Sequence, residues 1–258
     1  MGVTQLHDVV YIVCSGSSTV FRFNAITRQR LTDINVIGLK QPWDIVACQG
    51  TSRVYIADYE ECIWQVSSDG SDKKPWLPKS PSDTFMPWSL SVTSTRLLVT
   101  SRSTNQLIQF DSVGDELRRV PLPADMEPQH AVESPAGTYI VSRSNTQLSQ
   151  YQVAEVDTVG EVLRQFSGSH LRSLTWTPHV AVDSHGNIFV ADHDNHRIVL
   201  LDGQLTLRRV IIDEQQLKYK WPRCLCYMEQ SGQLLVGLFD DVGFDYGGDV
   251  AVFDVLCS

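Results

Sequence analysis

Long apolar runs are missing from this sequence, and none approaches the ~18 residues that a membrane-spanning helix needs. The first residues, 1–13, show neither a basic segment nor a small-residue cleavage site, so no secretory signal is recognised. Cysteine is sparse for a disulfide-stapled fold, with six in 258 residues, and no N-glycosylation sequon occurs. These absences favour a reduced, intracellular protein, which we expect in the cytoplasm and without membrane contact.

Motifs that carry catalytic chemistry are also missing. The sequence contains no G-x-S-x-G, H-E-x-x-H, P-loop or G-x-G-x-x-G pattern. Cys224 and Cys226 form C-x-C, which is not the C-x-x-C spacing of zinc or redox sites. His193 and His196 lack a third ligand for zinc, so we expect turn-bonding or solvated roles. The sequence therefore predicts no catalytic residue, no cofactor, no metal and no small-molecule substrate.

The net charge is −9 and the isoelectric point about 5.2. An acidic total disfavours a strongly electrostatic nucleic-acid binder, although a local basic face is compatible with it.

Five prolines divide the chain into similar segments: Pro42, Pro87, Pro128, Pro178 and Pro222. Their spacings are 45, 41, 50 and 44 residues, which is the period of four-stranded propeller blades. Each proline precedes an alternating apolar stretch, a polar turn and a β-prone run. These second strands are expected at 54–57, 97–100, 139–141, 188–191 and 234–237. Third strands are expected at 63–66, 107–110, 148–151, 198–201 and 250–253.

The segment before Pro42 fits the same template, with strands at 9–13, 20–23 and 31–36. The fold class predicted is an all-β, six-bladed β-propeller of four-stranded antiparallel blades in a single domain. The blades are expected at about residues 1–40, 41–85, 86–126, 127–176, 177–220 and 221–258. The last blade ends without a fourth strand of its own. Residues 1–5 form either the first strand of blade one or the strand that completes blade six.

One segment carries a family resemblance. Residues 177–209 resemble an NHL repeat at positions Pro178, Asp183, Gly186, Asn187, Ala191, Asp192, Asn195, Arg197 and Ile198. A fainter copy in the second blade keeps Pro42, Ile45, 54–58 and Ile63. The resemblance implies a propeller like the C-terminal domain of tripartite-motif ubiquitin ligases, which selects the substrate while a separate RING domain catalyses. No RING, B-box or coiled coil lies in these residues, so ligase activity is not assigned to them.

Two acidic features have competing interpretations. Asp58 and Asp192 occupy one repeat slot, shared with Cys14, Ser101, Ser142 and Leu238, where a short polar side chain can bond the backbone two residues on. The alternative, a carboxylate cluster for metal-assisted hydrolysis as in lactonases, is disfavoured because the slot varies too much. The acidic loop 240–249 resembles no EF-hand, and we expect a mobile loop there instead of a calcium site.

A binding face follows from the repeat, because equivalent slots of a propeller form a ring. Two such slots and the linkers between blades supply aromatic and basic residues, the types enriched in interface hot spots. The two Pro-Trp tryptophans have an alternative role as fillers of blade junctions, and Arg102 and Arg143, each in a Ser-Arg-Ser context, are both expected to be exposed. The predicted partner-binding residues are Trp43, Trp88, Gln129, His179, Arg223, Tyr59, Arg102, Arg143, His193, Phe239, Lys40, Arg172, Lys218 and Lys220.

Two functions from different classes remain. In the first, the domain is a non-catalytic module that recognises a protein partner through this face. In the second, the face binds RNA, with phosphates on the basic residues and bases stacked on Trp43, Trp88 or Tyr59. Acidic neighbours such as Asp125 and Glu127 favour protein. A propeller lactonase or lyase is a third, disfavoured possibility.

Overall fold

The structure is a computed structural model that describes residues 1–59, 62–78, 86–101, 103–145, 150–166, 178–240 and 248–255. Two predicted partner-binding residues, Arg102 and Arg172, lie outside this part of the chain. So does most of the predicted acidic loop, since residues 241–247 are not described. Among the described residues, no helical segment has the length and apolar composition that crossing a bilayer requires.

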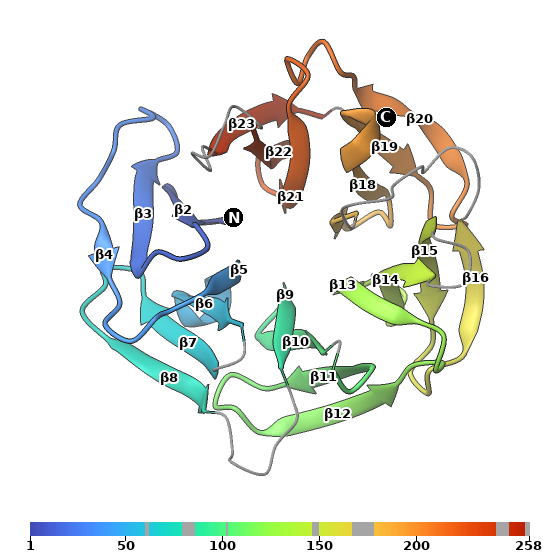
Figure 1. Cartoon of the computed structure of the whole chain (residues 1–258), viewed down its shortest axis with the longest axis horizontal. Helices are drawn as coiled ribbons and strands as arrows, with labels where there is room; N and C mark the ends of the chain where they lie inside the picture. The colour runs from blue at the N-terminus through green and yellow to red at the C-terminus, as the bar shows by residue number, and fades with distance from the viewer. Residues whose placement is uncertain are drawn as a thin grey trace. The chain divides into compact units, whose positions relative to one another are not determined.

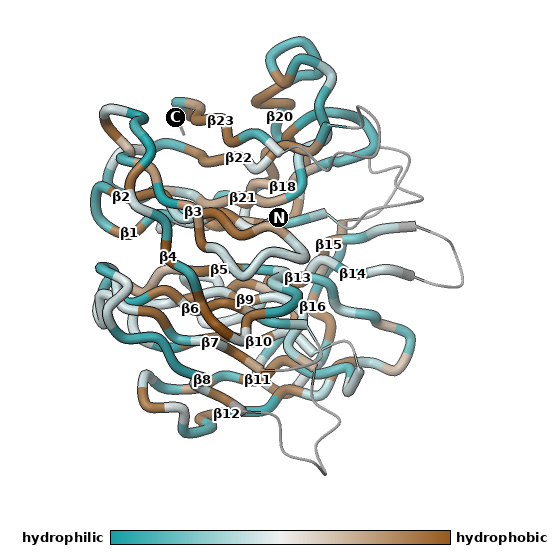
Figure 2. Tube along the Cα trace, turned by 60° about the vertical axis from the view of Figure 1, so that its left-hand side comes forward, coloured by the Kyte–Doolittle hydropathy of each residue, from teal (hydrophilic) through white to brown (hydrophobic). Residues whose placement is uncertain are grey.

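The fold class predicted from the proline period is confirmed: the chain is a six-bladed β-propeller of antiparallel sheets, five with four strands and one with three among the described residues. It divides into two compact units, unit 1 (Met1–Val120) and unit 2 (Pro121–Ser258). Figure 1 labels most of the strands of each sheet. Apolar residues are concentrated along the strands and polar ones in the turns (Figure 2), as period-two alternation requires.

Unit 1 contains three sheets whose strands pair in chain order. The first is β1 (Gly2–Leu6), β2 (Val9–Val13), β3 (Thr19–Asn24) and β4 (Ile34–Asn35). The second is β5 (Pro42–Cys48), β6 (Arg53–Asp58), β7 (Cys62–Ser67) and β8 (Lys73–Pro78), with a 3-10 turn η1 (Gln49–Thr51). The third is β9 (Pro87–Thr93), β10 (Arg96–Ser101), β11 (Gln106–Phe110) and β12 (Glu116–Pro121).

Unit 2 continues the pattern. Its first sheet is β13 (Glu127–Glu133), β14 (Tyr139–Asn145), β15 (Gln150–Val156) and β16 (Val162–Phe166). The next is β17 (Val180–Val182), β18 (Ile188–Asp192), β19 (Arg197–Leu201) and β20 (Leu207–Ile212), with a 3-10 turn η2 (His193–Asn195). The last, which we call the sixth sheet, is β21 (Trp221–Met228), β22 (Gln233–Phe239) and β23 (Gly248–Asp254).

Buried side chains fill the space between neighbouring sheets within each unit. In unit 1, Leu6 and Val13 of the first sheet pack in one cluster with Ile45 and Ile56 of the second. In unit 2, Phe189 joins side chains of β21 and β22 in one cluster and stacks on Tyr227 at 4.9 Å between ring centroids. Each sheet is therefore apolar on the faces that meet its neighbours, which explains the β-branched runs in the sequence.

The structure decides two points that the sequence left open or misplaced. Residues 2–6 form β1, which pairs with β2, so the N-terminal segment is the first strand of the first sheet. The third strand of the fourth sheet was expected at 148–151 but is β15, at 150–156, and Tyr139 pairs with Val156. Apolar Val153 and Val156 of β15 are the signal that the shorter window missed.

Gly70 illustrates how tightly a turn can pack against a neighbouring sheet. Its φ is +75°, and an added Cβ would lie 2.6 Å from Cγ1 of Ile34. Gly16 has a similar φ of +77° but open space around it. We expect Gly16→Ala to lower the free energy of unfolding by about 1 kcal/mol through backbone strain alone. Gly70→Ala should cost roughly 1–3 kcal/mol more, because Ile34 must also move; urea unfolding of both variants measures the difference.

Candidate functional site

The residue directly after the blade proline has an unusual backbone position in several sheets. Pro42 pairs with Asp58 and Asp44 with Ala57, so Trp43 is the extra residue of a β-bulge. The same register shift isolates Trp88 on β9, Gln129 on β13 and Arg223 on β21. Bulges redirect side chains and recur beside functional sites. The repeat slot chosen from the sequence is therefore a bulge position in these sheets.

Three predicted partner-binding residues come together in unit 1. The rings of Trp43 and Trp88 lie 4.7 Å apart between centroids. Tyr59 is 6.3 Å from Trp43 and 5.4 Å from Trp88, edge-on to the latter. All three are half-buried, so they pack on one another and still present part of their surface to solvent. We call Trp43, Tyr59 and Trp88 the tryptophan cluster; it combines large apolar area with polar N–H and O–H handles.

Asp58 holds the backbone on which this cluster stands. It is fully buried and accepts hydrogen bonds from the backbone N–H of Lys40 at 3.1 Å and of Gln41 at 2.7 Å. The indole of Trp64 donates to it at 3.3 Å, and the N–H of Tyr59 donates to the carbonyl of Gln41. The carboxylate therefore bonds the linker that precedes β5 and fixes the chain entering that strand; the residue two positions on, Glu60, lies outside the described residues.

A second aromatic group forms in unit 2 around Trp221, the first residue of β21. His196 lies 5.0 Å and His193 6.2 Å from its ring. Phe239 lies 6.5 Å away, and the Arg223 guanidinium lies 6.0 Å from the Phe239 ring. This Trp221 group contains three predicted site residues, His193, Arg223 and Phe239.

The charged side chains near this group are engaged locally. His193 is buried and its Nδ1 lies 2.6 Å from Asp194, although burial keeps its pKa below the usual value. Asp192 binds Arg197 at 2.7 Å and Asn195 at 2.8 Å, yet burial raises its pKa. Lys220 forms ion pairs with Asp240 and Asp249. Of the residues predicted to bind phosphate, Lys220 is thus neutralised by two carboxylates.

Arg143 is a correction to the sequence prediction. We expected it to be exposed, one position beyond the slot of Asp58 and Asp192. Because His130 pairs with Ser142 and Pro128 with Arg143, Arg143 itself occupies that slot. It is 6% exposed, donates to Gln165 Oε1 at 2.8 Å, and its pKa is lowered by burial.

The other predicted residues divide by exposure. Lys40 and Lys218 are exposed, whereas Gln129 is 5% exposed and buried in β13.

His179 was assigned to the slot of Trp43 and Trp88, which the register corrects. Ala191 donates to the His179 carbonyl at 2.9 Å, which aligns His179 with His130 and Asp44 because this sheet lacks the bulge.

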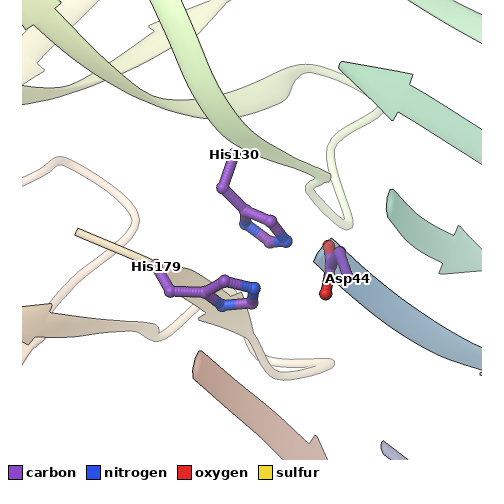
Figure 3. Close-up of side chains that lie close together, drawn as sticks. All are labelled: Asp44, His130 and His179. Atoms are coloured by element: carbon purple, nitrogen blue, oxygen red, sulfur yellow. The ribbon is translucent and has the colours of Figure 1, made fainter. Parts of the chain in front are cut away.

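His130 and His179 form a close pair that the sequence did not predict. Their rings lie one above the other at 3.6 Å between centroids (Figure 3). The Leu225 N–H donates to His179 Nδ1 at 3.3 Å, which places the proton of the neutral ring on Nε2. Burial, together with the adjacent His130, holds the pKa of His179 well below its usual value. Ligand nitrogens of the two rings lie within 4.8 Å of one another, so both imidazoles could bind one metal ion.

Asp44 of unit 1, also labelled in Figure 3, is a buried carboxyl at the start of β5. Its oxygens accept from the Ile45 N–H at 2.9 Å and the Leu90 N–H at 2.8 Å. Burial outweighs these bonds and raises the pKa to about 6. The folded state therefore binds this proton more tightly than the unfolded chain, in which the pKa is about 3.9.

The raised pKa has a measurable consequence for stability. The contribution of Asp44 is most favourable at acid pH and is lost as the pH rises from about 4 to 6. Carboxyls such as Asp157 and Asp202 have lowered pKa values and the opposite trend, so we compare the wild type with Asp44→Asn. Between about pH 4.5 and about pH 7, the free energy of unfolding of the wild type should fall by about 2 kcal/mol relative to the variant. A constant difference between the two urea-unfolding series would contradict the raised pKa.

Comparisons with known proteins place the fold and no more. No protein-family model matches the sequence, and no curated protein matches it. Among solved structures, the chain is similar to Kuenenia stuttgartiensis hydrazine synthase, with 13% identity, a TM-score of 0.69, and coverage of 100% of this chain and 84% of that one. It is also similar to a catalytically inactive Staphylococcus aureus virginiamycin B lyase, determined with quinupristin, with 13% identity, a TM-score of 0.67, and coverage of 92% of this chain and 76% of that one. For the β-propeller domain of Myceliophteria thermophila Cps50 (Swd1), the identity is 12%, the TM-score is 0.64, and the alignment covers 99% of this chain and 83% of that one.

Proposed function

We propose that this chain is a non-catalytic recognition module that binds a protein partner through the tryptophan cluster of unit 1. The observation that carries the proposal is the contact among Trp43, Tyr59 and Trp88, all half-buried on bulge or turn positions. Interface hot spots are enriched in Trp and Tyr because these residues bring large area at low entropic cost. The Trp221 group of unit 2 is a second patch of the same chemistry.

The NHL resemblance gives the proposal its context. Asn195 and Arg197, which match the repeat, both donate hydrogen bonds to Asp192, so these three residues stabilise the turn and leave binding to their neighbours. By this analogy the propeller selects substrates for a cytoplasmic tripartite-motif ubiquitin ligase, whose catalytic RING domain is separate. Enzymes also occur among the structural neighbours, but at 13% identity their activities are not transferred.

Charge argues against RNA as the partner. Unit 1 has 12 basic and 12 acidic residues, and unit 2 has 9 basic and 18 acidic, so the whole net charge of −9 belongs to unit 2. Of the basic residues predicted to bind phosphate, Arg143 is buried and Lys220 is paired with two carboxylates. A partner that contacts aromatic surface and tolerates acidic surroundings fits better than a polyanion.

The proposal is tested by two parallel selections with the intact chain. A phage-displayed library of random linear peptides and a pool of single-stranded and hairpin RNAs are selected at about 150 mM salt. Enriched sequences are synthesised and their affinities measured by fluorescence anisotropy. We expect peptides with micromolar or better affinity and only weak RNA binding. Tight, salt-sensitive RNA binding without peptide enrichment would replace the protein partner by RNA.

A further inference from the structure

The sixth sheet ends in a strand that is more exposed than the third strands of the other sheets. Among the described residues this sheet has three strands, with β23 at its edge. The equivalent third strands β11 and β19 are buried at every position after the first. In β23, by contrast, no residue is buried, and Val252 is 36% exposed. The exposed strand corresponds to a position that a fourth strand covers in the other sheets.

The edge of β23 has fewer of the features that protect the other sheet edges. The fourth strands carry Lys73 and Pro75 in β8, Arg164 in β16 and Arg208 in β20, and the pairings of these three strands contain register shifts. Charged side chains, prolines and bulges discourage further pairing. In β23 all seven residues pair with β22 without a shift, and none is Lys, Arg or Pro. This is a regular edge suited to pairing.

The hydrogen-bonding groups that face outward can be identified. The Val255 N–H donates to the Gly232 carbonyl at 3.1 Å, so the backbone N–H and C=O groups of Val255 point toward β22. Because the direction alternates along an antiparallel pair, the N–H and C=O groups of Val250, Val252 and Asp254 point to the open side. Three residues therefore offer a ladder of donors and acceptors to an added strand.

We propose that β23 accepts an extended segment of a partner protein as an antiparallel fourth strand. The chain itself indicates the chemistry of this segment. The fourth strands ELRRVP (β12), VLRQF (β16) and LRRVII (β20) share a leucine followed by arginine. Arg164 of β16 binds Glu155 of β15 at 2.9 Å, and Arg119 of β12 binds Gln106 of β11 at 2.8 Å. β23 belongs to the acidic unit and contains no Lys or Arg of its own; its Asp249 is paired with Lys220, and its Asp254 accepts from Gln233 at 2.8 Å. A basic strand with the Leu-Arg pattern is therefore complementary to the charge of this unit.

A second copy of this chain is a poorer occupant. Pairing β23 with β23 would bring Asp249 and Asp254 of both copies together, and no basic side chain of the strand would compensate them. This binding mode goes beyond the proposed function, because it uses backbone groups of unit 2 and not the tryptophan cluster of unit 1. The two proposals can therefore fail separately.

The test uses the intact chain and a labelled peptide with the sequence of residues 205–212, LTLRRVII. Saturable binding of one peptide per chain is expected by fluorescence anisotropy, and the peptide with Arg208→Glu and Arg209→Glu should bind at least about tenfold more weakly. In the protein, Val252→Pro removes an outward N–H and should weaken binding at least about tenfold, whereas the matched Val252→Ala should not.

Hydrogen exchange locates the peptide even if the proline variant fails to fold. With saturating peptide on the wild-type chain, the amides of Val250, Val252 and Asp254 should exchange at least about tenfold more slowly, and those of the already protected strand β20 should be unchanged. Absence of binding, or binding that leaves these three amides unaffected, would overturn the proposal. Slow exchange in the chain alone would also overturn it, indicating a second copy if sedimentation shows a dimer and a segment of the same chain if it shows a monomer.

Discussion

Replacing Trp88 by alanine is expected to weaken binding of the selected peptide partner by about 30-fold or more. Trp88 lies against both Trp43 and Tyr59, so its removal takes away its own contact area and the support of the other two rings. Hot-spot truncations of this kind cost about 2 kcal/mol or more, and each 1.4 kcal/mol is tenfold in affinity. Isothermal titration calorimetry of the wild type and the variant measures the change.

A matched control uses an exposed apolar residue of the same sheet. Val113 is 74% exposed in the turn between β11 and β12. Because the strands alternate in direction, this turn lies at the opposite end of the sheet from Trp88 at the start of β9. Val113→Ala should leave the affinity within about twofold, since isolated exposed apolar residues contribute little. Equal losses in the two variants would show that the partner does not bind at the tryptophan cluster.

Asp58→Ala is expected to lower the free energy of unfolding by about 3 kcal/mol. The substitution removes the acceptor for the Lys40 and Gln41 N–H groups and for the Trp64 indole at a site with no solvent access. Leaving buried donors without an acceptor is among the few large causes of destabilisation. The linker into β5 would also lose its anchor, so the variant should bind the peptide partner more weakly.

Asp69→Ala provides the comparison for this effect. Asp69 also accepts three hydrogen bonds, from the Ser67 hydroxyl and from the Ser71 hydroxyl and N–H. It is exposed, so water can replace it as acceptor and we expect only a small loss. Urea unfolding of both variants measures the contrast. Similar losses would mean that the number of hydrogen bonds, and not burial, determines the cost.

The strands were predictable because period-two alternation and the proline spacing report directly on half-buried sheets. The exact slots were less predictable. A β-bulge adds one residue without changing the spacing signal, so His179, in a sheet without the bulge, was placed with Trp43 although it aligns with His130. The predicted repeat position of Arg143 was wrong by one residue for the same reason, and a register error of one residue exchanges buried and exposed positions.

Contacts between blades were the least predictable part of the candidate site. The sequence placed Trp43, Tyr59 and Trp88 on one face, but their mutual contact depends on how neighbouring sheets pack. The His130–His179 pair had a signal in the sequence, since Pro128-Gln129-His130 and Pro178-His179 differ by the one bulge residue. Reading that difference as a bulge would have brought the two histidines into one slot.

The most direct test of the recognition proposal is a two-dimensional NMR titration of the tryptophan indole N–H signals with the selected peptide. Trp43 and Trp88 report on the tryptophan cluster, whereas Trp76, packed against Tyr55 and Phe110, is the control. The proposal predicts large, saturable shifts of the Trp43 and Trp88 signals and a small shift of the Trp76 signal. Saturable binding that leaves Trp43 and Trp88 unshifted would contradict it.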